Sequence, residues 1–255
     1  MLEKDYRHTA SKGNSFIDSP PYWIINELYQ FESKPNARMI MGSAAEEGAM
    51  NAIQKEAYDE DTIHEFTQKK FRELGGSDDD DESEMAAKIA VRFKDSLISF
   101  GDVLSYQKEI QVPGKPYGLK HDICCKTDFE FKDIIIDTKA TAYLKRLKSG
   151  ALDKNWYPKP SDVRQQFLYK EIFKKQTMLL YCSYNDTEAV EIEHLDSSLD
   201  EMINAFKTIE HITSIAKTKE DVVRMFPLNL ENFRWGKGDS DAKIFAKEIW
   251  QKAWK

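Results

Sequence analysis

The chain has 255 residues, of which 41% are hydrophobic and 32% are charged, and its formal net charge is -7 at pH 7. This composition excludes an integral membrane protein, because no apolar run approaches the roughly 18 residues that span a bilayer, and it argues against a wholly disordered chain. The charged N-terminal residues lack the apolar stretch of a secretory signal, so we expect a cytoplasmic protein with no membrane partner.

The N-terminal part, residues 19–100, is expected to be helical. Ser19 followed by two prolines is typical of a helix N-cap, and an amphipathic helix is expected to follow it. The alanine-rich residues 42–58 predict a second helix, and a third is expected to begin in an acidic run and to end at Gly101. That run is interpreted as a solvated loop rather than a metal site, and it comprises Asp78, Asp79, Asp80, Asp81, Glu82 and Glu84.

The hydrophobic pattern changes from a helical period to strict alternation after residue 101. Residues 104–112 alternate in this way, which predicts a half-buried strand. Further strands are expected at 118–126, 134–139, 178–183 and 189–193, with a helix capped by Ser161 among them and helices again from about residue 199.

We therefore expect an α/β or α+β fold, in which helices cover a mixed, partly antiparallel sheet. The expected organisation is one domain over 1–255. Its parts would be N-terminal helices over 19–100, a sheet core over 101–193 and C-terminal helices over 194–255.

An acidic and a basic residue end the most apolar strand. Asp137 and Lys139 follow three isoleucines and are two residues apart, so they project from the same face of the strand. A surface ion pair is the simpler interpretation of this pattern alone. If residues 118–139 form a hairpin that turns between Phe129 and Glu130, however, Asp122 stands opposite Asp137. Two carboxylates at about 5 Å repel each other unless a proton or a cation lies between them, which predicts a magnesium site.

Two helices offer further polar groups. Glu46 has apolar residues at its helical neighbour positions, so it is expected to point inward, where a buried carboxylate needs a partner. A glutamate paired with a lysine remains the alternative. Gln165 and Tyr169 are four residues apart, so their polar ends emerge on one face of the helix after Ser161.

The basic residues concentrate in the middle of the chain. Residues 1–110 carry 13 Lys and Arg against 22 Asp and Glu, a net -9, whereas residues 139–175 carry ten basic residues against three acidic ones. Four aromatic residues, Tyr143, Trp156, Tyr157 and Tyr169, are interleaved with these charges. The segment could therefore contact phosphates and stack on bases, although a merely soluble surface would show the same charge.

The successive motifs resemble those of RecB-like nucleases of the PD-(D/E)XK superfamily, and the resemblance spans residues 19–193. The motifs are residues 42–46 (GSAAE), 118–122 (GLKHD), 137–139 (DTK) and 165–169 (QQFLY). Each is short, but their order and spacing agree with the family pattern. The resemblance implies a nuclease that cuts DNA with Mg²⁺ or Mn²⁺, and a phage-type or repair exonuclease is the expected relative.

The resemblance also implies roles for individual residues. Glu46, Asp122 and Asp137, with the backbone carbonyl of Thr138, would hold one or two cations, and Lys139 would orient or activate a water. Gln165 and Tyr169 would position the strand or the water at the entrance of the site. The residues expected to follow the DNA backbone are Lys145, Arg146, Lys148, Arg164 and Lys170.

The chain departs from some relatives in two respects. Many place histidine where Glu46 stands, and oxygen-only ligands favour magnesium or manganese over softer metals. Others hold an iron-sulfur cluster through four cysteines, whereas this chain has only Cys124, Cys125 and Cys182, so no cluster is expected and the thiols are expected to be buried. His121 is expected to be structural or to neighbour a phosphate.

Three alternatives remain open at the level of sequence. They are a structure-selective endonuclease of the same fold, a nucleic-acid-binding module that does not cleave, and a hydrolase of small phosphoesters. The last does not account for the basic segment. Possible partners besides DNA are a second copy of the chain, since some relatives form rings, and a phage or host recombination protein.

Overall fold

The computed structural model describes residues 2, 5–32, 34–77, 80–192, 196–236 and 240–255. Contacts divide the chain into two compact units, each discontinuous in sequence. Unit 1 comprises residues 1–34, 109–125 and 195–255, and unit 2 comprises residues 35–108 and 126–194. This organisation replaces the three consecutive parts expected from sequence.

A five-stranded mixed sheet forms the centre of unit 2, which confirms the expected α/β class. Its order is β1-β4-β5-β6-β7, and β5 and β6 are parallel whereas the other pairs are antiparallel. The strands are β1 (Ser105–Tyr106), β4 (Phe129–Glu130), β5 (Ile134–Ala140), β6 (Gln176–Cys182) and β7 (Thr187–Glu191).

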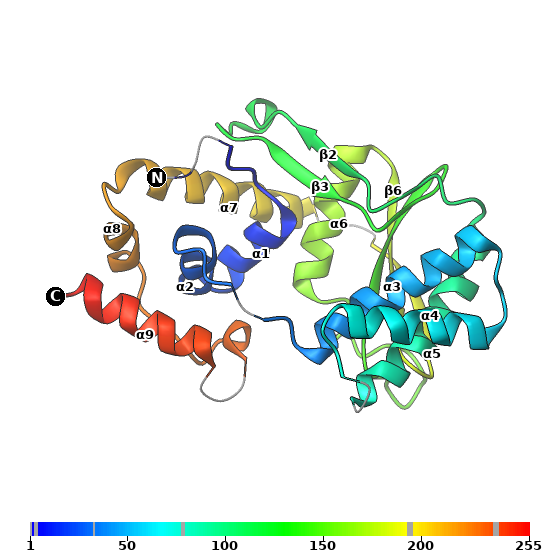
Figure 1. Ribbon diagram of the computed structural model, residues 1–255. Helices are drawn as coiled ribbons and strands as arrows, with labels where there is room; N and C mark the ends of the chain where they lie inside the picture. The colour runs from blue at the N-terminus through cyan, green and yellow to red at the C-terminus, as the bar shows by residue number, and fades with distance from the viewer. Residues whose placement is uncertain (1, 3–4, 33, 78–79, 193–195, 237–239) are drawn as a thin grey trace. The chain divides into compact units, whose positions relative to one another are not determined.

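Three helices of unit 2 pack against one another and bury most of its apolar residues (Figure 1). They are α3 (Ala37–Lys55), α4 (Glu60–Glu73) and α5 (Asp81–Leu97), which continues as a 3-10 turn over Ile98–Phe100. The small residues of α3 permit a close approach, since a Cβ at Gly48 would lie 2.1 Å from Thr67 Oγ1 of α4. A fourth helix, α6 (Pro160–Phe173), joins β5 to β6 as the crossover that parallel strands require.

Unit 1 is mainly helical, with one two-stranded sheet. Its α-helices are α1 (Ala10–Asp18), α2 (Pro20–Trp23), α7 (Asp196–Ile215), α8 (Lys219–Arg224) and α9 (Asp241–Ala253). A π-helical turn follows α2 (Ile24–Leu28), and 3-10 turns form at Lys115–Tyr117 and Phe233–Trp235. The strands of its two-stranded sheet are β2 (Glu109–Val112) and β3 (Ile123–Lys126). Trp23, Ile24 and Ile25 are fully buried in its core. Ser19 caps α2 as expected, because its hydroxyl accepts the N–H of Tyr22 at 3.4 Å.

Two expected strands are shorter than the alternation suggested. The segment 104–112 divides into β1 and β2, which belong to different sheets, and Gln107 between them has a left-handed φ of 49°. The strand expected over 118–126 is formed only from Ile123 onward, after a 3-10 turn that ends at Gly118 with φ of 76°. In both cases the apolar pattern continues through a turn that periodicity alone does not reveal.

Several other predictions from the sequence can be compared with the observed elements. The helices α1 and α4 and the strand β4 were not expected from the sequence, and the N-cap of α6 is Lys159 rather than Ser161. In the acidic run, Asp78 and Asp79 lie outside the described residues, and the helix α5 begins within the run, at Asp81. Glu193, the last residue of an expected strand, also lies outside the described residues. Within the described residues, no helix combines the length and the hydrophobicity needed to cross a bilayer.

Glu130 on β4 ties three segments of unit 2 together. Its carboxylate accepts hydrogen bonds from the Ser105 hydroxyl at 2.7 Å and from the ammonium groups of Lys108 at 2.8 Å and Lys175 at 2.7 Å. Burial alone would raise the pKa of Glu130, but the two lysines and the hydroxyl lower it to about 2.

Replacing Glu130 is therefore expected to destabilise the protein in a pH-dependent way. Glu130→Gln should lower the free energy of unfolding by about 2 kcal/mol at pH 7, since a buried group loses its charge-assisted bonds. Because the folded-state pKa lies below the usual value, this stabilisation is present above about pH 4.5 and is lost as the pH falls toward 2. Urea unfolding at several pH values measures it, with Glu65→Gln at an exposed position of α4 as the control. A difference from wild type that does not change with pH would contradict this account.

Candidate active site

The end of β5 places an acid and a base side by side, as the sequence suggested. Asp137 is 1% exposed, and its carboxylate forms an ion pair with Lys139. The side-chain amide of Gln165 on α6 donates to Asp137 Oδ1 at 2.8 Å and to the hydroxyl of Tyr169 at 3.1 Å. That hydroxyl donates in turn to the carbonyl of Lys126 at 2.6 Å.

The structure places Gln165 and Tyr169 against Asp137 and the backbone of Lys126. Tyr169 is 5% exposed, so it does not lie at the entrance of a site, where the sequence reading placed it. Both residues connect α6 to other parts of unit 2, namely the carboxylate of Asp137 and the carbonyl of Lys126, and so hold Asp137 in its observed orientation.

The carboxylate opposite Asp137 is Asp128, not Asp122. In the observed register Phe129 pairs with Ile136, so the hairpin turns three residues later in the chain than expected. One pair further on, this register brings Asp128 opposite Asp137. Asp122 lies in unit 1, where it accepts the Gln111 amide at 2.6 Å. The predicted hairpin was wrong because its turn was placed at Phe129, a residue buried in the sheet.

Thr138 connects Asp128 with Glu46 of α3. Its backbone N–H donates to Asp128 Oδ2 at 2.8 Å, and its hydroxyl lies 3.2 Å from the same oxygen and 3.1 Å from Glu46 Oε2. The amide of Gln107 donates to Glu46 Oε1 at 3.0 Å. Glu46 therefore points into this cluster, as its helical neighbours predicted, whereas the adjacent Glu47 forms an ion pair with Lys70 on α4 at 2.8 Å.

The three carboxylates are costly to ionise together. Burial raises the pKa of Asp137 to about 8, although Lys139 opposes the shift. Burial and the neighbouring Glu46 raise the pKa of Asp128 to about 6, and burial also raises the pKa of Glu46. Burial disfavours the ammonium of Lys139, but Asp137 and other nearby carboxylates outweigh it and raise the pKa of Lys139. The lysine is therefore held in its protonated form.

These residues fit a hard divalent cation. Glu46, Asp128 and Asp137 supply oxygen ligands only, which suits magnesium or manganese, and a cation would remove both the repulsion and the cost of burial. The oxygens of these three carboxylates do not all lie within 4.8 Å of one another. Among the described residues, one group of His, Cys, Asp and Glu side chains is that close together, and it lies in unit 1. Binding would therefore exchange the hydrogen bonds to Thr138 and Gln107 for metal bonds. The structure shows Thr138 holding the carboxylates through its N–H and hydroxyl.

Two of the arginines and lysines expected to contact DNA are already engaged within the fold. Arg146 donates to Asp186 and to Glu188 and forms ion pairs with both, the latter at 3.0 Å. Arg164 is 5% exposed and is likewise engaged with a neighbour. Both side chains therefore have partners within the chain, which their positive charge alone did not indicate.

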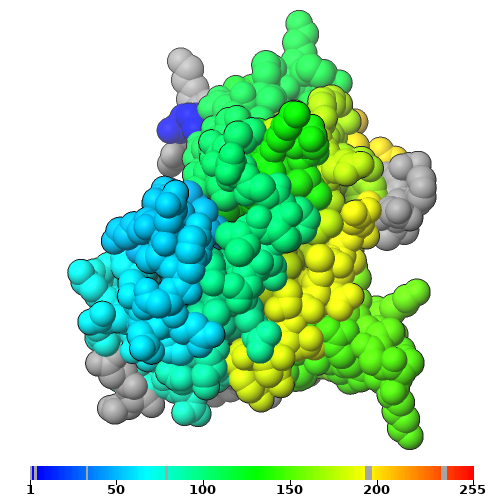
Figure 2. All heavy atoms as spheres, turned by 90° about the vertical axis from the view of Figure 1, so that its right-hand side faces the viewer, coloured from blue at the N-terminus to red at the C-terminus, as the bar shows by residue number. Residues whose placement is uncertain are grey.

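Other basic residues of this stretch do face solvent. Lys148 and Lys170 are exposed, and Lys145 lies between Asp153, at 3.2 Å, and the ring of Trp156, at 4.7 Å. Trp156 is 49% exposed and Tyr143 is 56% exposed. Apart from Lys170, which lies on α6, these residues belong to segment 141–159, which protrudes in Figure 2, where it is light green. It begins directly after β5, which carries Asp137, and ends at α6, which carries Gln165.

The sequence contains a pattern from which the role of Asp128 could have been predicted. Lys132 and Asp133 are two adjacent polar residues between apolar runs, which is typical of a hairpin turn, and both are exposed. A turn there would have paired Asp128 with Asp137. Gln107 left no such signal, because its approach to Glu46 depends on tertiary packing. The three cysteines are free and buried, as expected.

Comparisons with known proteins add no assignment. No family model matches the chain, and no curated protein matches it. Among solved structures the chain is similar to one described as the crystal structure of SSO0001, with 10% identity, a TM-score of 0.35, and coverage of 78% of this chain and 86% of that one. A TM-score of this size is too low to transfer a fold family or a function.

The two candidate aspartates can be separated by metal binding. Asp128→Asn is expected to weaken Mn²⁺ binding by at least about tenfold, since it removes a charged ligand, whereas Asp122→Asn should leave the affinity unchanged. Isothermal titration with Mn²⁺ measures both. Asp133→Asn, in the exposed turn of the same hairpin, is the control for loss of one negative charge. Equal affinities for wild type and Asp128→Asn would contradict this metal site.

Proposed function

We propose that the chain is a divalent-metal-dependent deoxyribonuclease that hydrolyses phosphodiester bonds, and that it acts as an exonuclease on DNA ends. The observation that supports this most is the pairing of buried Asp137 with Lys139, next to Asp128 and Glu46 on a shared threonine. Clustered acids repel a phosphate unless a cation is bound, so such a cluster has little use in a protein that only binds DNA. The resemblance to RecB-like nucleases points to the same chemistry.

The chain's own residues have distinct parts in the proposed reaction. Glu46, Asp128 and Asp137 would hold Mg²⁺ or Mn²⁺, which when bound stabilises charge on the phosphate and lowers the pKa of a water. Lys139, which forms an ion pair with Asp137, would donate to a phosphate oxygen and orient or help activate the attacking water. Gln165 would keep Asp137 Oδ1 in a fixed orientation.

Segment 141–159 is the proposed contact for the DNA strand. It follows the C-terminal end of β5, and ligands of α/β sheets bind outside this end of parallel strands. The exposed Tyr143 and Trp156 offer faces for bases, and Lys148 offers charge for phosphates. An end-acting enzyme in phage, repair or recombination metabolism would meet this substrate in the cytoplasm, the host's if the chain is phage-encoded.

Removal of Lys139 tests the catalytic proposal. Lys139→Ala should reduce Mg²⁺-dependent cleavage of end-labelled linear DNA by at least about a hundredfold, because a preorganised charge at the phosphate is lost. Lys132→Ala, an exposed lysine in the turn at the other end of β5, should cleave like wild type. Cleavage by wild type should disappear in EDTA.

The products distinguish the modes of action. Release of mononucleotides or short fragments from labelled ends, with covalently closed circular DNA left intact, is expected of an exonuclease. Cutting of the circular DNA would instead identify an endonuclease. Full activity of Lys139→Ala, or cleavage that persists in EDTA, would exclude the proposed mechanism.

Trp156 is expected to contribute to DNA affinity. Trp156→Ala should weaken binding of a single-stranded oligonucleotide by about tenfold, since stacking of one base on an aromatic ring is worth about 1–3 kcal/mol. Fluorescence anisotropy in the presence of Ca²⁺ measures binding. Trp254→Ala is the matched control, because Trp254 is also exposed, at 67%, but lies beyond α9 in unit 1. Equal losses in the two variants would argue against a specific role for Trp156.

A further inference from the structure

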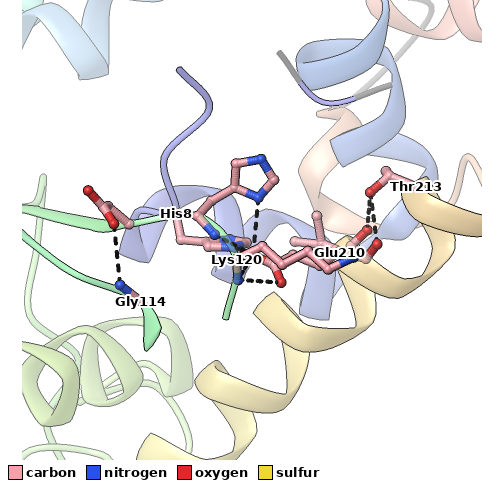
Figure 3. A network of polar contacts seen from close by, with 8 residues as sticks. His8, Gly114, Lys120, Glu210 and Thr213 are labelled. Carbon is pink, nitrogen blue, oxygen red and sulfur yellow. Dashed lines mark hydrogen bonds and ion pairs between the residues drawn. The ribbon is translucent and has the colours of Figure 1, made fainter. Parts of the chain in front are cut away.

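A second cluster of metal-ligating side chains lies wholly within unit 1 and shares no residue with the carboxylate cluster of unit 2. His8 comes from the N-terminal segment, His121 precedes β3, and Glu210 lies on α7. Their ligand atoms all lie within 4.8 Å of one another. Figure 3 shows the side chains of His8 and Glu210 directed toward each other, next to Lys120.

One oxygen of Glu210 has more nitrogen neighbours than it can accept. His8 Nε2 lies 3.0 Å from Oε1 and His121 Nδ1 lies 3.1 Å from it. The backbone N–H of His121 donates to the same oxygen at 2.8 Å, while that of Lys120 is shared at 2.9 Å between Oε1 and Oε2. A carboxylate oxygen has two lone pairs. With one used by the backbone of His121, a single lone pair remains for two imidazole rings.

The spacing of these atoms is close to that of a coordination sphere. Bonds of about 2.0–2.1 Å to a tetrahedral zinc ion place neighbouring ligand atoms roughly 3.3 Å apart. The observed separations from Glu210 Oε1 of 3.0 and 3.1 Å need only a small expansion to admit the ion. Two imidazoles and one carboxylate are also a donor set that zinc uses in proteins.

The rings are held in place without a metal. His8 is fully buried, and its ring stacks on Phe206 with centroids 4.5 Å apart, while the edge of Tyr6 packs against both His8 and His121. Burial lowers the pKa of His8 and so favours the neutral ring, the form that binds metals. The side chain of His121 is 21% exposed, which leaves an approach from solvent.

We propose that His8, His121 and Glu210 form a structural binding site for a zinc-type divalent cation, which joins three segments of unit 1 that are far apart in sequence. The backbone N–H groups of Lys120 and His121 orient the Glu210 carboxylate as outer partners of the ion. Imidazole ligands select zinc over magnesium, whereas the all-oxygen cluster of unit 2 has the opposite preference. This proposal does not depend on the nuclease activity.

Zinc content of the full chain tests the proposal. After equilibrium dialysis against Zn²⁺ in excess Mg²⁺, which occupies oxygen-only sites, wild type is expected to retain about one zinc per chain by mass spectrometry of the metal. His121→Ala should bind zinc at least about a hundredfold more weakly. His211→Ala, an exposed histidine next to Glu210 on α7, should bind zinc like wild type. Thermal unfolding should show stabilisation by zinc in wild type and in His211→Ala, but not in His121→Ala.

A measurement on wild type removes any dependence on the folding of a variant. With ¹⁵N-labelled histidine, zinc should shift the ring resonances of two of the five histidines, those of His8 and His121. Failure to retain zinc, or shifts confined to other histidines, would show that the cluster is a hydrogen-bond network only. Zinc binding unchanged by His121→Ala in a folded variant would overturn the proposal as well.

Discussion

The burial of the Asp137 carboxylate is the constraint on which the arrangement of unit 2 depends. A carboxylate removed from water is tolerated only with partners, and this one has an ion pair with Lys139 on its own strand and a hydrogen bond from Gln165 on α6. Two more carboxylates lie close by, fixed through Thr138 and Gln107. Repulsion and burial therefore concentrate at one end of β5, where a divalent cation would relieve both.

The sequence predicted the elements of this site better than their register. Asp137 could be placed beside Lys139, and Gln165 beside Tyr169, because strand alternation and helical spacing are local properties. The partner of Asp137 could not, because it depends on where a hairpin turns, and a turn displaced by three residues changes the opposing residue from Asp128 to Asp122. Lys132 and Asp133 mark the turn in the sequence, but that Phe129 is buried in the sheet rather than placed in a turn is known only from the folded chain.

Charge counts were a poorer guide than residue positions. The segment 139–175 is strongly basic in composition, yet Arg146 is neutralised by Asp186 and Glu188 from the neighbouring strand region, and Arg164 is buried. Pairing of this kind joins residues some 40 positions apart, so no window along the sequence detects it. The division into two units was missed for a similar reason, since it depends on contacts between the N-terminal segment, residues 109–125 and α7.

The interleaving of the two units has a consequence for how the protein can be made. The chain passes between them at four places, after residues 34, 108, 125 and 194. During synthesis, every residue of unit 2 has been translated before the third segment of unit 1 leaves the ribosome. The contact between His8 and Glu210 can therefore form only after residue 210 has been translated, and no single continuous fragment contains unit 1 without unit 2.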